Sequence, residues 1–159
     1  MVYLSRGVAR QDATEYRLWV VRGGEDFLLT GMEAALWLNG RFRPAFVHTP
    51  YEKRMLRRLV RMGTAVAEEQ EGADSVREML DRCEFCAARA SGFRFPIFGA
   101  ERQVFGWAVK KGACFTVSGL AGLMETGVVP SGRAGREDAE GKAVKTVLSL
   151  VRKKRLLAL

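Results

Sequence analysis

Five basic residues between positions 50 and 62 recur at a spacing that suits one face of an α-helix. They are Lys53, Arg54, Arg57, Arg58 and Arg61. At about 100° per residue they fall within roughly 140° of one another. The apolar residues of the opposite side are Met55, Leu56, Leu59, Val60 and Met62. Such cations can neutralise phosphates, and arginine can also bind guanine through two hydrogen bonds. The basic stripe therefore predicts a nucleic-acid contact, with an ordinary solvated helix face as the alternative.

A second basic group lies near the C-terminus. Its members are Lys142, Lys145, Arg152 and Lys153. They face away from an apolar stripe made of Val144, Val147, Leu148 and Val151. These cations could contact phosphate, or they could belong to a tail that only favours solubility.

Cys83 and Cys86 have the spacing of half a tetrahedral zinc site. The remaining candidates for the other half, His48 and Cys114, are distant in sequence. The two cysteines also continue the apolar stripe of a helix expected from Asp74, so we expect buried structural cysteines, with no metal and no cofactor. Three cysteines without an export segment predict a reducing, cytoplasmic location.

The sequence offers no motif for catalysis. It contains neither a phosphate-binding glycine loop nor a nucleophile elbow or a metalloprotease helix. His48, the single histidine, precedes Thr49-Pro50 and is expected in a loop or a cap. We therefore expect a protein that is not an enzyme.

Three phenylalanines, Phe93, Phe95 and Phe98, surround Arg94 in a segment that breaks the helical pattern. Rings beside a cation could stack on the bases of single-stranded nucleic acid. The more ordinary expectation is that these rings insert into the core and pin a linker.

Two capping signals define the helices that carry the basic stripe and its predecessor. Thr30 is followed three residues later by Glu33, which predicts a helix beginning at Thr30. Thr49 is followed by Pro50 and by Glu52, which predicts a helix over residues 50–62 that ends at a glycine.

The other expected elements are short. Residues 15–21 alternate as a strand that two glycines end, and residues 64–68 form a second strand. Further helices are expected from about residue 74, at 101–111, from Thr116 and from about 137 towards the end.

A weak internal repeat is also visible. Thr30 and Thr116 each precede a short helix, and each half then has a longer helix that contains Leu-Val-Arg, at 59–61 and at 150–152. Because the spacings differ, chance similarity between amphipathic helices remains an alternative.

The order of strand, capped helix, loop, capped basic helix, glycine and short strand resembles a winged helix-turn-helix unit. Leu28-Leu29-Thr30, Trp37 and residues 54–66 carry this resemblance. It implies a fold that is mostly α with a few short strands. The implied domains are a winged-helix-like unit over 1–89, a linker at 90–99 and a smaller helical, possible repeat unit over 100–159.

The resemblance and the net charge of +8 together imply a DNA-binding protein, a transcriptional regulator with residues 50–62 as its recognition helix. Related regulators often dimerise through terminal helices, so the resemblance also implies a homodimer through the C-terminal helix. Since no run of eighteen apolar residues occurs, no membrane span is expected.

The alternative is a winged-helix-like module that binds a protein partner, with the acidic segment at 68–84 excluding DNA. Binding to DNA requires that carboxylates such as those of Glu68 and Glu69 do not hold the arginines of the stripe.

Overall fold

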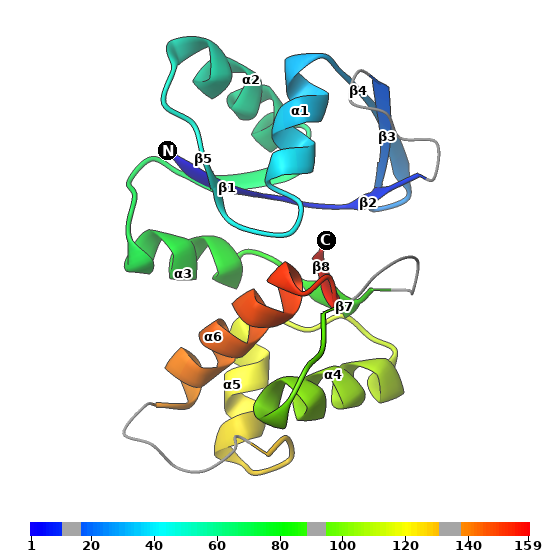
Figure 1. Cartoon of the computed structure of the whole chain (residues 1–159), viewed down its shortest axis with the longest axis vertical. Helices are drawn as coiled ribbons and strands as arrows, with labels where there is room; N and C mark the ends of the chain where they lie inside the picture. Colours follow the sequence, from blue (N-terminus) through cyan, green and yellow to red (C-terminus); the bar gives the residue numbers. More distant parts are fainter. Residues whose placement is uncertain (11–16, 89–94, 131–137) are drawn as a thin grey trace. The chain divides into compact units, whose positions relative to one another are not determined.

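The computed structural model describes residues 1–10, 17–88, 95–130 and 138–159. Within these ranges lie six helices and eight short strands, which form three small sheets (Figure 1). The chain divides into two compact units. Unit 1 contains Met1–Met79 with Ala158–Leu159, and unit 2 contains Leu80–Leu157. Each unit has its own elements and is described by itself.

The expectation of a mostly α fold is wrong, because the described residues are 46% helical and 22% strand and the fold is mixed α/β. The reason is that most strands are too short to show alternation in the sequence. Strand β1 (Val2–Ser5) is buried at all four positions, and β5 (Ala45–Phe46) has only two residues. Pairing with distant segments, and not a local period, makes these residues strands.

Unit 1 is organised around β1. It pairs antiparallel with β5 on one side and with β6 (Ala65–Glu68) on the other, so that Val2 lies opposite both Phe46 and Glu68. The central position explains the complete burial of β1. The predicted strand at 64–68 is confirmed as β6.

A second sheet of unit 1 is formed by β2 (Val8–Ala9), β3 (Arg17–Arg22) and β4 (Glu25–Thr30). Gly23 and Gly24 join β3 to β4 with φ angles of 60° and 84°. Two positive φ angles define the two-residue turn that matches the twist of a hairpin. The strand predicted at 15–21 corresponds to β3, although its first two positions lie outside the described residues.

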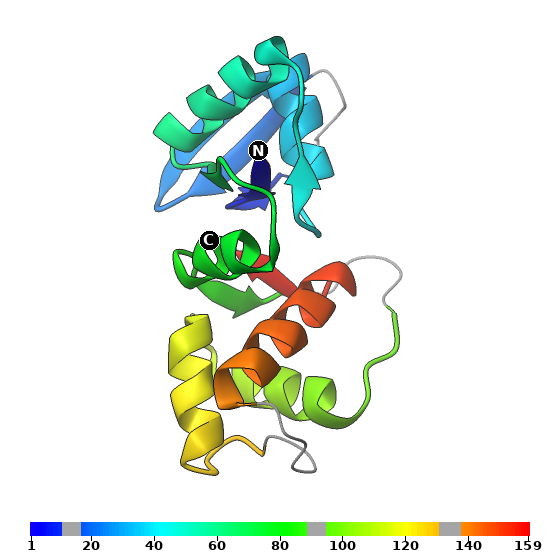
Figure 2. The same cartoon turned by 90° about the vertical axis from the view of Figure 1, so that its left-hand side faces the viewer.

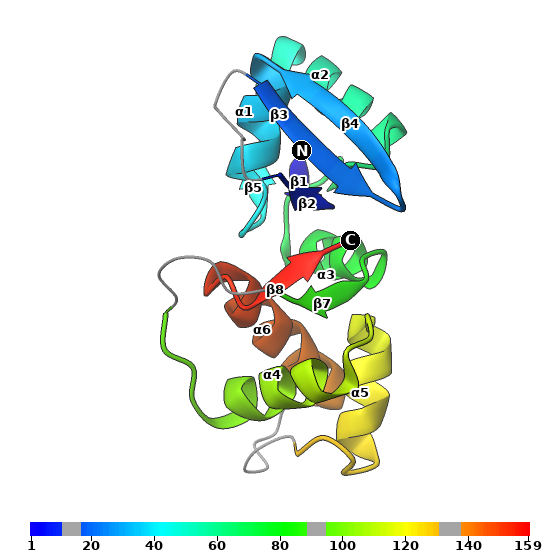
Figure 3. The same cartoon turned by 90° about the vertical axis from the view of Figure 1, so that its right-hand side faces the viewer.

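Helices α1 (Met32–Asn39) and α2 (Pro50–Arg61) pack against each other in unit 1, and Figure 3 shows the β3–β4 hairpin beside them. The predicted cap of α1 is wrong. Gly31 occupies the N-cap position, and Thr30 ends β4 opposite Arg17. Hairpin pairing therefore outweighs the capping signal there.

The capping box of α2 is confirmed. Glu52 N–H donates to the Thr49 hydroxyl at 3.2 Å, and Thr49 N–H donates to the Glu52 carboxylate at 3.1 Å.

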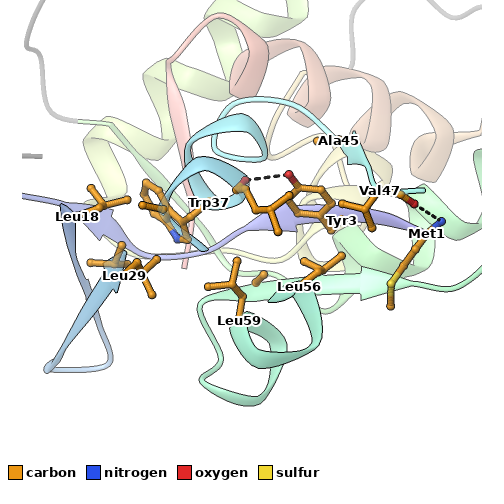
Figure 4. Packing of buried hydrophobic residues seen from close by; sticks show 13 residues of the cluster. Met1, Tyr3, Leu18, Leu29, Trp37, Ala45, Val47, Leu56 and Leu59 are labelled. Atoms are coloured by element: carbon orange, nitrogen blue, oxygen red, sulfur yellow. Dashed lines mark hydrogen bonds between the residues drawn. The ribbon is translucent and has the colours of Figure 1, made fainter. Parts of the chain in front are cut away.

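The core of unit 1 surrounds Tyr3, Trp37, Leu56 and Leu59, all fully buried (Figure 4). Trp37 Nε1 donates to the Arg6 carbonyl at 3.1 Å, and the Tyr3 hydroxyl donates to the Leu36 carbonyl at 2.9 Å. Burial raises the pKa of Tyr3 to about 12, so this hydroxyl keeps its proton across the ordinary pH range. These bonds attach α1 to the central strand and fix the surface on which α2 rests.

Unit 2 contains β7 (Phe85–Ala87), α4 (Gly99–Lys111), α5 (Val117–Glu125), α6 (Ala139–Arg152) and the first two residues of β8 (Leu156–Ala158). Helices α4 and α5 both pack on α6 (Figure 2). Strand β7 pairs with β8, and Phe85 also forms an antiparallel bridge with Phe115. The predicted Thr116 cap is confirmed, since its hydroxyl accepts from Gly119 N–H at 3.1 Å.

The division between the units falls within α3 (Ala73–Asp81), between Met79 and Leu80. The predicted linker at 90–99 lies partly outside the described residues, which resume at 95. The last two residues of the chain belong to unit 1. There the carbonyl of Ala158 accepts from Gly7 N–H at 2.8 Å, and that of Leu159 accepts from Arg6 Nε at 2.7 Å.

The ends of α2 and α6 have the same hydrogen bonds. After α2, Gly63 N–H donates to the Val60 carbonyl at 3.0 Å, and Thr64 N–H donates to the Leu59 carbonyl at 2.9 Å. After α6, Lys154 N–H donates to the Val151 carbonyl at 2.9 Å, and Arg155 N–H donates to the Leu150 carbonyl at 2.8 Å. Both ends are Schellman motifs, and each leads into a strand four residues after the helix ends. The Leu-Val-Arg similarity therefore lies at matching places in the two units.

Candidate nucleic-acid interface

The basic stripe lies on the outer side of α2. Leu56 and Leu59 point into the core and are fully buried, with Met55 and Met62 packed at its edge. The side chains left outside are those of Arg54, Arg57, Arg58 and Arg61, while Lys53 is half-buried. Val60 was expected on the buried side, but it is 39% exposed beside the stripe. The predicted segregation of α2 into a core face and a basic face holds apart from this residue.

Arg58 is held by a carboxylate of α1. Its Nε lies 3.0 Å from Glu33 Oε1, and the Glu33 side chain is only 9% exposed. A carboxylate removed from water needs a compensating charge, so Glu33 keeps Arg58 in place. This ion pair joins α1 to α2 and gives Arg58 a structural role. Glu33, which the sequence suggested as a capping residue, therefore positions a residue of the basic stripe. The sequence alone did not reveal this role.

Arg57 also has an acidic partner, but a weaker one. Its Nη2 donates to Glu69 Oε1 at 3.2 Å, and the side chains are 60% and 64% exposed. Exposed ion pairs stabilise proteins by about 0–1 kcal/mol because water and salt screen them. Arg57 can therefore exchange Glu69 for another anion at little cost. Two arginines of the stripe thus have acidic partners, one held firmly and one loosely.

Arg54 and Arg61 form no ion pair with a carboxylate in the part of the chain that the structure describes. They are seven residues apart, which is two turns of helix, so they share a line along the exposed face of α2. Together with Arg57 they form the outer row, a name kept below for Arg54, Arg57 and Arg61.

The N-terminal end of α2 adjoins an acidic contact. Glu71 accepts a hydrogen bond from the Met1 amino group at 3.0 Å and lies 3.7 Å from His48 Nδ1. Hydrogen bonding to the amino group lowers the pKa of Glu71, and the nearby Lys53 acts in the same direction. His48 is exposed just before the helix, as expected for a loop residue. Lys53 therefore faces local negative charge, as Arg57 does beside Glu69, whereas Arg54 and Arg61 form no ion pair with a described carboxylate.

The second basic group is only partly available. Lys153 Nζ lies 2.6 Å from Glu101 Oε2 of α4, and the Ser149 hydroxyl also bonds to Glu101. Burial alone would raise the pKa of Glu101, but the hydrogen bonds from Lys153 and Ser149 outweigh it and lower the pKa. Lys153 therefore fastens α6 to α4. Of the other members, Lys145 and Arg152 are exposed and Lys142 is half-buried.

The apolar stripe of α6 is covered within unit 2. Val147, Leu150 and Val151 are buried, and so is Leu156. The chain does not continue as a helix to its end, because α6 ends at Arg152 and Leu156 begins β8. The residues that suggested a dimer contact therefore belong mainly to the core.

The cysteines take three different environments. Cys83 is fully buried, Cys86 is half-buried in β7 and Cys114 is exposed. The expectation that Cys83 and Cys86 continue the apolar stripe of a helix is wrong for both, because α3 ends at Asp81. Among the described residues, no group of three His, Cys, Asp or Glu side chains could hold a metal ion.

The expectation that the phenylalanines of 93–98 insert into the core is wrong for Phe95 and Phe98. These rings are 48% and 73% exposed, and Phe93 and Arg94 lie outside the described residues. The Phe95 carbonyl accepts from Arg155 Nη2 at 3.1 Å, which fixes the backbone and leaves the ring outside.

None of the helices in the described ranges is long and apolar enough to cross a bilayer. Comparison with known proteins gave no match to a family model, to a curated protein or to a solved structure.

Proposed function

We propose that this chain binds DNA through the exposed face of α2 and acts in transcriptional regulation, as the winged-helix resemblance implies. The observation that carries the proposal is the outer row, in which Arg54, Arg57 and Arg61 share one exposed helix face. A helix of this width fits the major groove, and guanidinium groups along it can reach phosphates and guanine edges.

The proposed contact uses fewer residues than the five that the sequence predicted. Arg58 forms an ion pair with the buried carboxylate of Glu33 and orients α2. Arg57 contributes after it exchanges Glu69 for a phosphate, a step that costs about 0–1 kcal/mol. Arg54 and Arg61 are ready to bind without breaking an ion pair to a described carboxylate.

Unit 2 has exposed cations of its own that can also contact phosphate. Most of the basic excess of the chain lies after residue 80, and α6 exposes Lys145 and Arg152. The shared Schellman ends of α2 and α6 place a basic helix before a short strand in both units.

The test is binding of a fluorescent duplex by the full chain across salt concentrations of roughly 50 to 200 mM. The double variant Arg54→Ala/Arg61→Ala should weaken binding and lower the salt slope by about 0.9 for each phosphate that the variant no longer neutralises. Lys110→Ala/Lys111→Ala removes the same charge from the exposed end of α4 and is the matched control. Equal affinity for the wild type and the Arg54/Arg61 variant would remove α2 from the interface.

A second candidate is a protein-binding module. It is favoured by the ion pairs of Arg57 and Arg58, and by the exposure of Tyr51 and Val60 on the same helix. Aromatic and apolar groups between arginines are typical of protein interfaces. This candidate predicts no affinity for duplex or single-stranded nucleic acid at physiological salt. It also predicts a protein partner whose capture is abolished in Tyr51→Ala but kept in Lys110→Ala/Lys111→Ala.

A further inference from the structure

The bridge between Phe85 and Phe115 determines which cysteines face each other. Phe85 N–H donates to Phe115 O at 2.7 Å, and Phe115 N–H donates to Phe85 O at 2.9 Å. The two residues are therefore a hydrogen-bonded antiparallel pair. One step along the bridge, Cys86 lies opposite Cys114 at a non-hydrogen-bonded position. The Cα atoms of such pairs are about 4.5 Å apart, within the range that a disulfide spans.

Burial agrees with this register. The rings of Phe85 and Phe115 are on the buried side, 6.2 Å apart between centroids. Side chains alternate along extended chain, so Cys86 and Cys114 must share the opposite side. Cys86 is indeed half-buried and Cys114 exposed. Burial raises the pKa of Cys86, and the neighbouring Cys114 raises it further, as expected for thiols on the same side of the bridge.

Small molecules can reach this site. A pocket of about 530 Å³ lies beside Cys86 and includes Gly112 and Ala113, just before Cys114. Phe105 and Ala108 of α4 form part of its wall. Cys83 differs, because it is fully buried and precedes the bridge. The pair suggested by sequence spacing, Cys83 with Cys86, is thus not the pair that the fold brings face to face.

We propose that Cys86 and Cys114 form a reversible disulfide when the protein meets a peroxide, and that this pair is a redox modification site. Cys114 reacts first because it is the exposed thiol. Its thiolate attacks one peroxide oxygen, the O–O bond breaks, and a sulfenic acid forms while the leaving hydroxide takes a proton to become water. The sulfur of Cys86 then attacks the sulfenic sulfur. The S–S bond forms and the S–O bond breaks, releasing a second water with the Cys86 proton.

The electrons balance in this sequence. The two thiols together give up two electrons and two protons, and hydrogen peroxide is reduced to two molecules of water. A dithiol reductant reverses the modification through a mixed disulfide. The site is independent of the outer row of α2, so its test does not depend on DNA binding.

The experiment is treatment of the reduced full chain with hydrogen peroxide, followed by alkylation of the remaining thiols and mass spectrometry. The intact protein should lose two hydrogen atoms and keep one alkylatable thiol after denaturation. Trypsin places Cys83 and Cys86 in one peptide, 83–89, and Cys114 in another that begins at Gly112. The two peptides should be joined, and fragmentation between Glu84 and Phe85 should place the bond on Cys86.

Two serine variants and one control make the result decisive. Cys86→Ser should stop at a sulfenic acid on Cys114, and Cys114→Ser should keep both thiols at the same peroxide dose. Cys83→Ala should still form the bond. If Cys83→Ala does not fold, the fragmentation result in the wild type carries the same information. A bond between Cys83 and Cys114, a dimer linked through Cys114, or three free thiols after oxidation would each overturn the proposal.

Discussion

Gly63 and Lys154 occupy the same position in the two units. Each follows the C-cap of a long helix in the left-handed conformation, with φ angles of 74° and 58°. Glycine adopts this conformation freely, whereas a lysine there costs about 1–2 kcal/mol. Lys154 is the one non-glycine residue with positive φ in the described ranges. The second unit therefore keeps the geometry of the first without its preferred residue.

This difference predicts opposite effects of two substitutions. Lys154→Gly should raise the free energy of unfolding by about 0.5–1 kcal/mol, after the higher chain entropy of glycine is subtracted. Gly63→Ala should lower it by about 1–2 kcal/mol, and its Cβ would also collide with Arg22 Nη1. Urea unfolding measures both. Gly106→Ala is the control, because it lies within α4 without positive φ and should stabilise by roughly 0.5–1 kcal/mol. A neutral or destabilising Lys154→Gly would contradict the argument.

The two arginines with acidic partners should differ in their effect on stability. Arg58→Ala leaves the buried carboxylate of Glu33 without its cation and should destabilise by about 1–3 kcal/mol. Arg57→Ala breaks an exposed pair and should cost about 0–1 kcal/mol. Thermal or urea unfolding of both variants provides the comparison. Restoration of stability by Glu33→Gln in the Arg58→Ala background would show that the loss arises at this pair, and equal effects of the two single variants would refute it.

The pair of Glu101 with Lys153 and Ser149 should make unit 2 sensitive to acid. The pKa of Glu101 is lowered in the folded state, so its stabilising contribution is present above the unfolded pKa and is lost as the pH falls through the folded pKa. Glu101→Gln should therefore unfold more easily than wild type at neutral pH, and the difference should shrink in acid. Urea unfolding midpoints of both proteins, measured from neutral pH down into acid, show whether the difference shrinks. Glu125→Gln removes the same charge from an exposed position of α5 and is the matched control. A Glu101→Gln effect that does not shrink in acid would contradict the argument.

The two threonines with similar sequence signals should respond differently to alanine. Thr49→Ala removes the hydroxyl that accepts from Glu52 N–H and should cost about 0.5–2 kcal/mol. Thr30→Ala changes an exposed position at the end of β4 and should cost less than about 0.5 kcal/mol. Loss of helical circular dichroism on heating compares them. A larger loss in Thr30→Ala would contradict the assignment of Gly31 as the cap of α1.

Oxidation of Cys86 and Cys114 should stabilise unit 2. The bond would close a loop of 28 residues along the chain, which predicts about 3–4 kcal/mol from the lower entropy of the unfolded state. Melting curves of oxidised and reduced protein measure the gain, with Cys114→Ser under the same oxidant as the reference. An unchanged or lower melting temperature of the bridged protein would indicate that the bond forms only by straining the Phe85–Phe115 bridge.

Helix α2 shows how far local signals reach. A capping box, a proline at the first position and an apolar stripe predicted 50–62, and the helix spans Pro50–Arg61. The same kind of local evidence predicted β6 and the Thr116 cap. All of these depend on residues within about one or two helical turns, so neighbours along the chain decide them.

The predictions that were wrong, a cap at Thr30 and a helix to the end of the chain, share a different cause. Thr30 carries a capping signal, but pairing with Arg17 across the hairpin determines its structure. The last residues look like the end of an amphipathic helix, yet β8 forms because β7 is available to pair. Strand pairing joins residues that are far apart in sequence, and no short window contains both partners.

The sequence by itself determined the helix that carries the basic stripe, because capping and periodicity act over a few residues. Only the tertiary structure decided which of those arginines are available. Glu33 approaches Arg58 because α1 packs on α2. Glu69 approaches Arg57 because β6, which ends one residue before Glu69, lies against α2. Likewise, Cys86 faces Cys114 and not Cys83, since antiparallel register, and not spacing, determines which side chains meet.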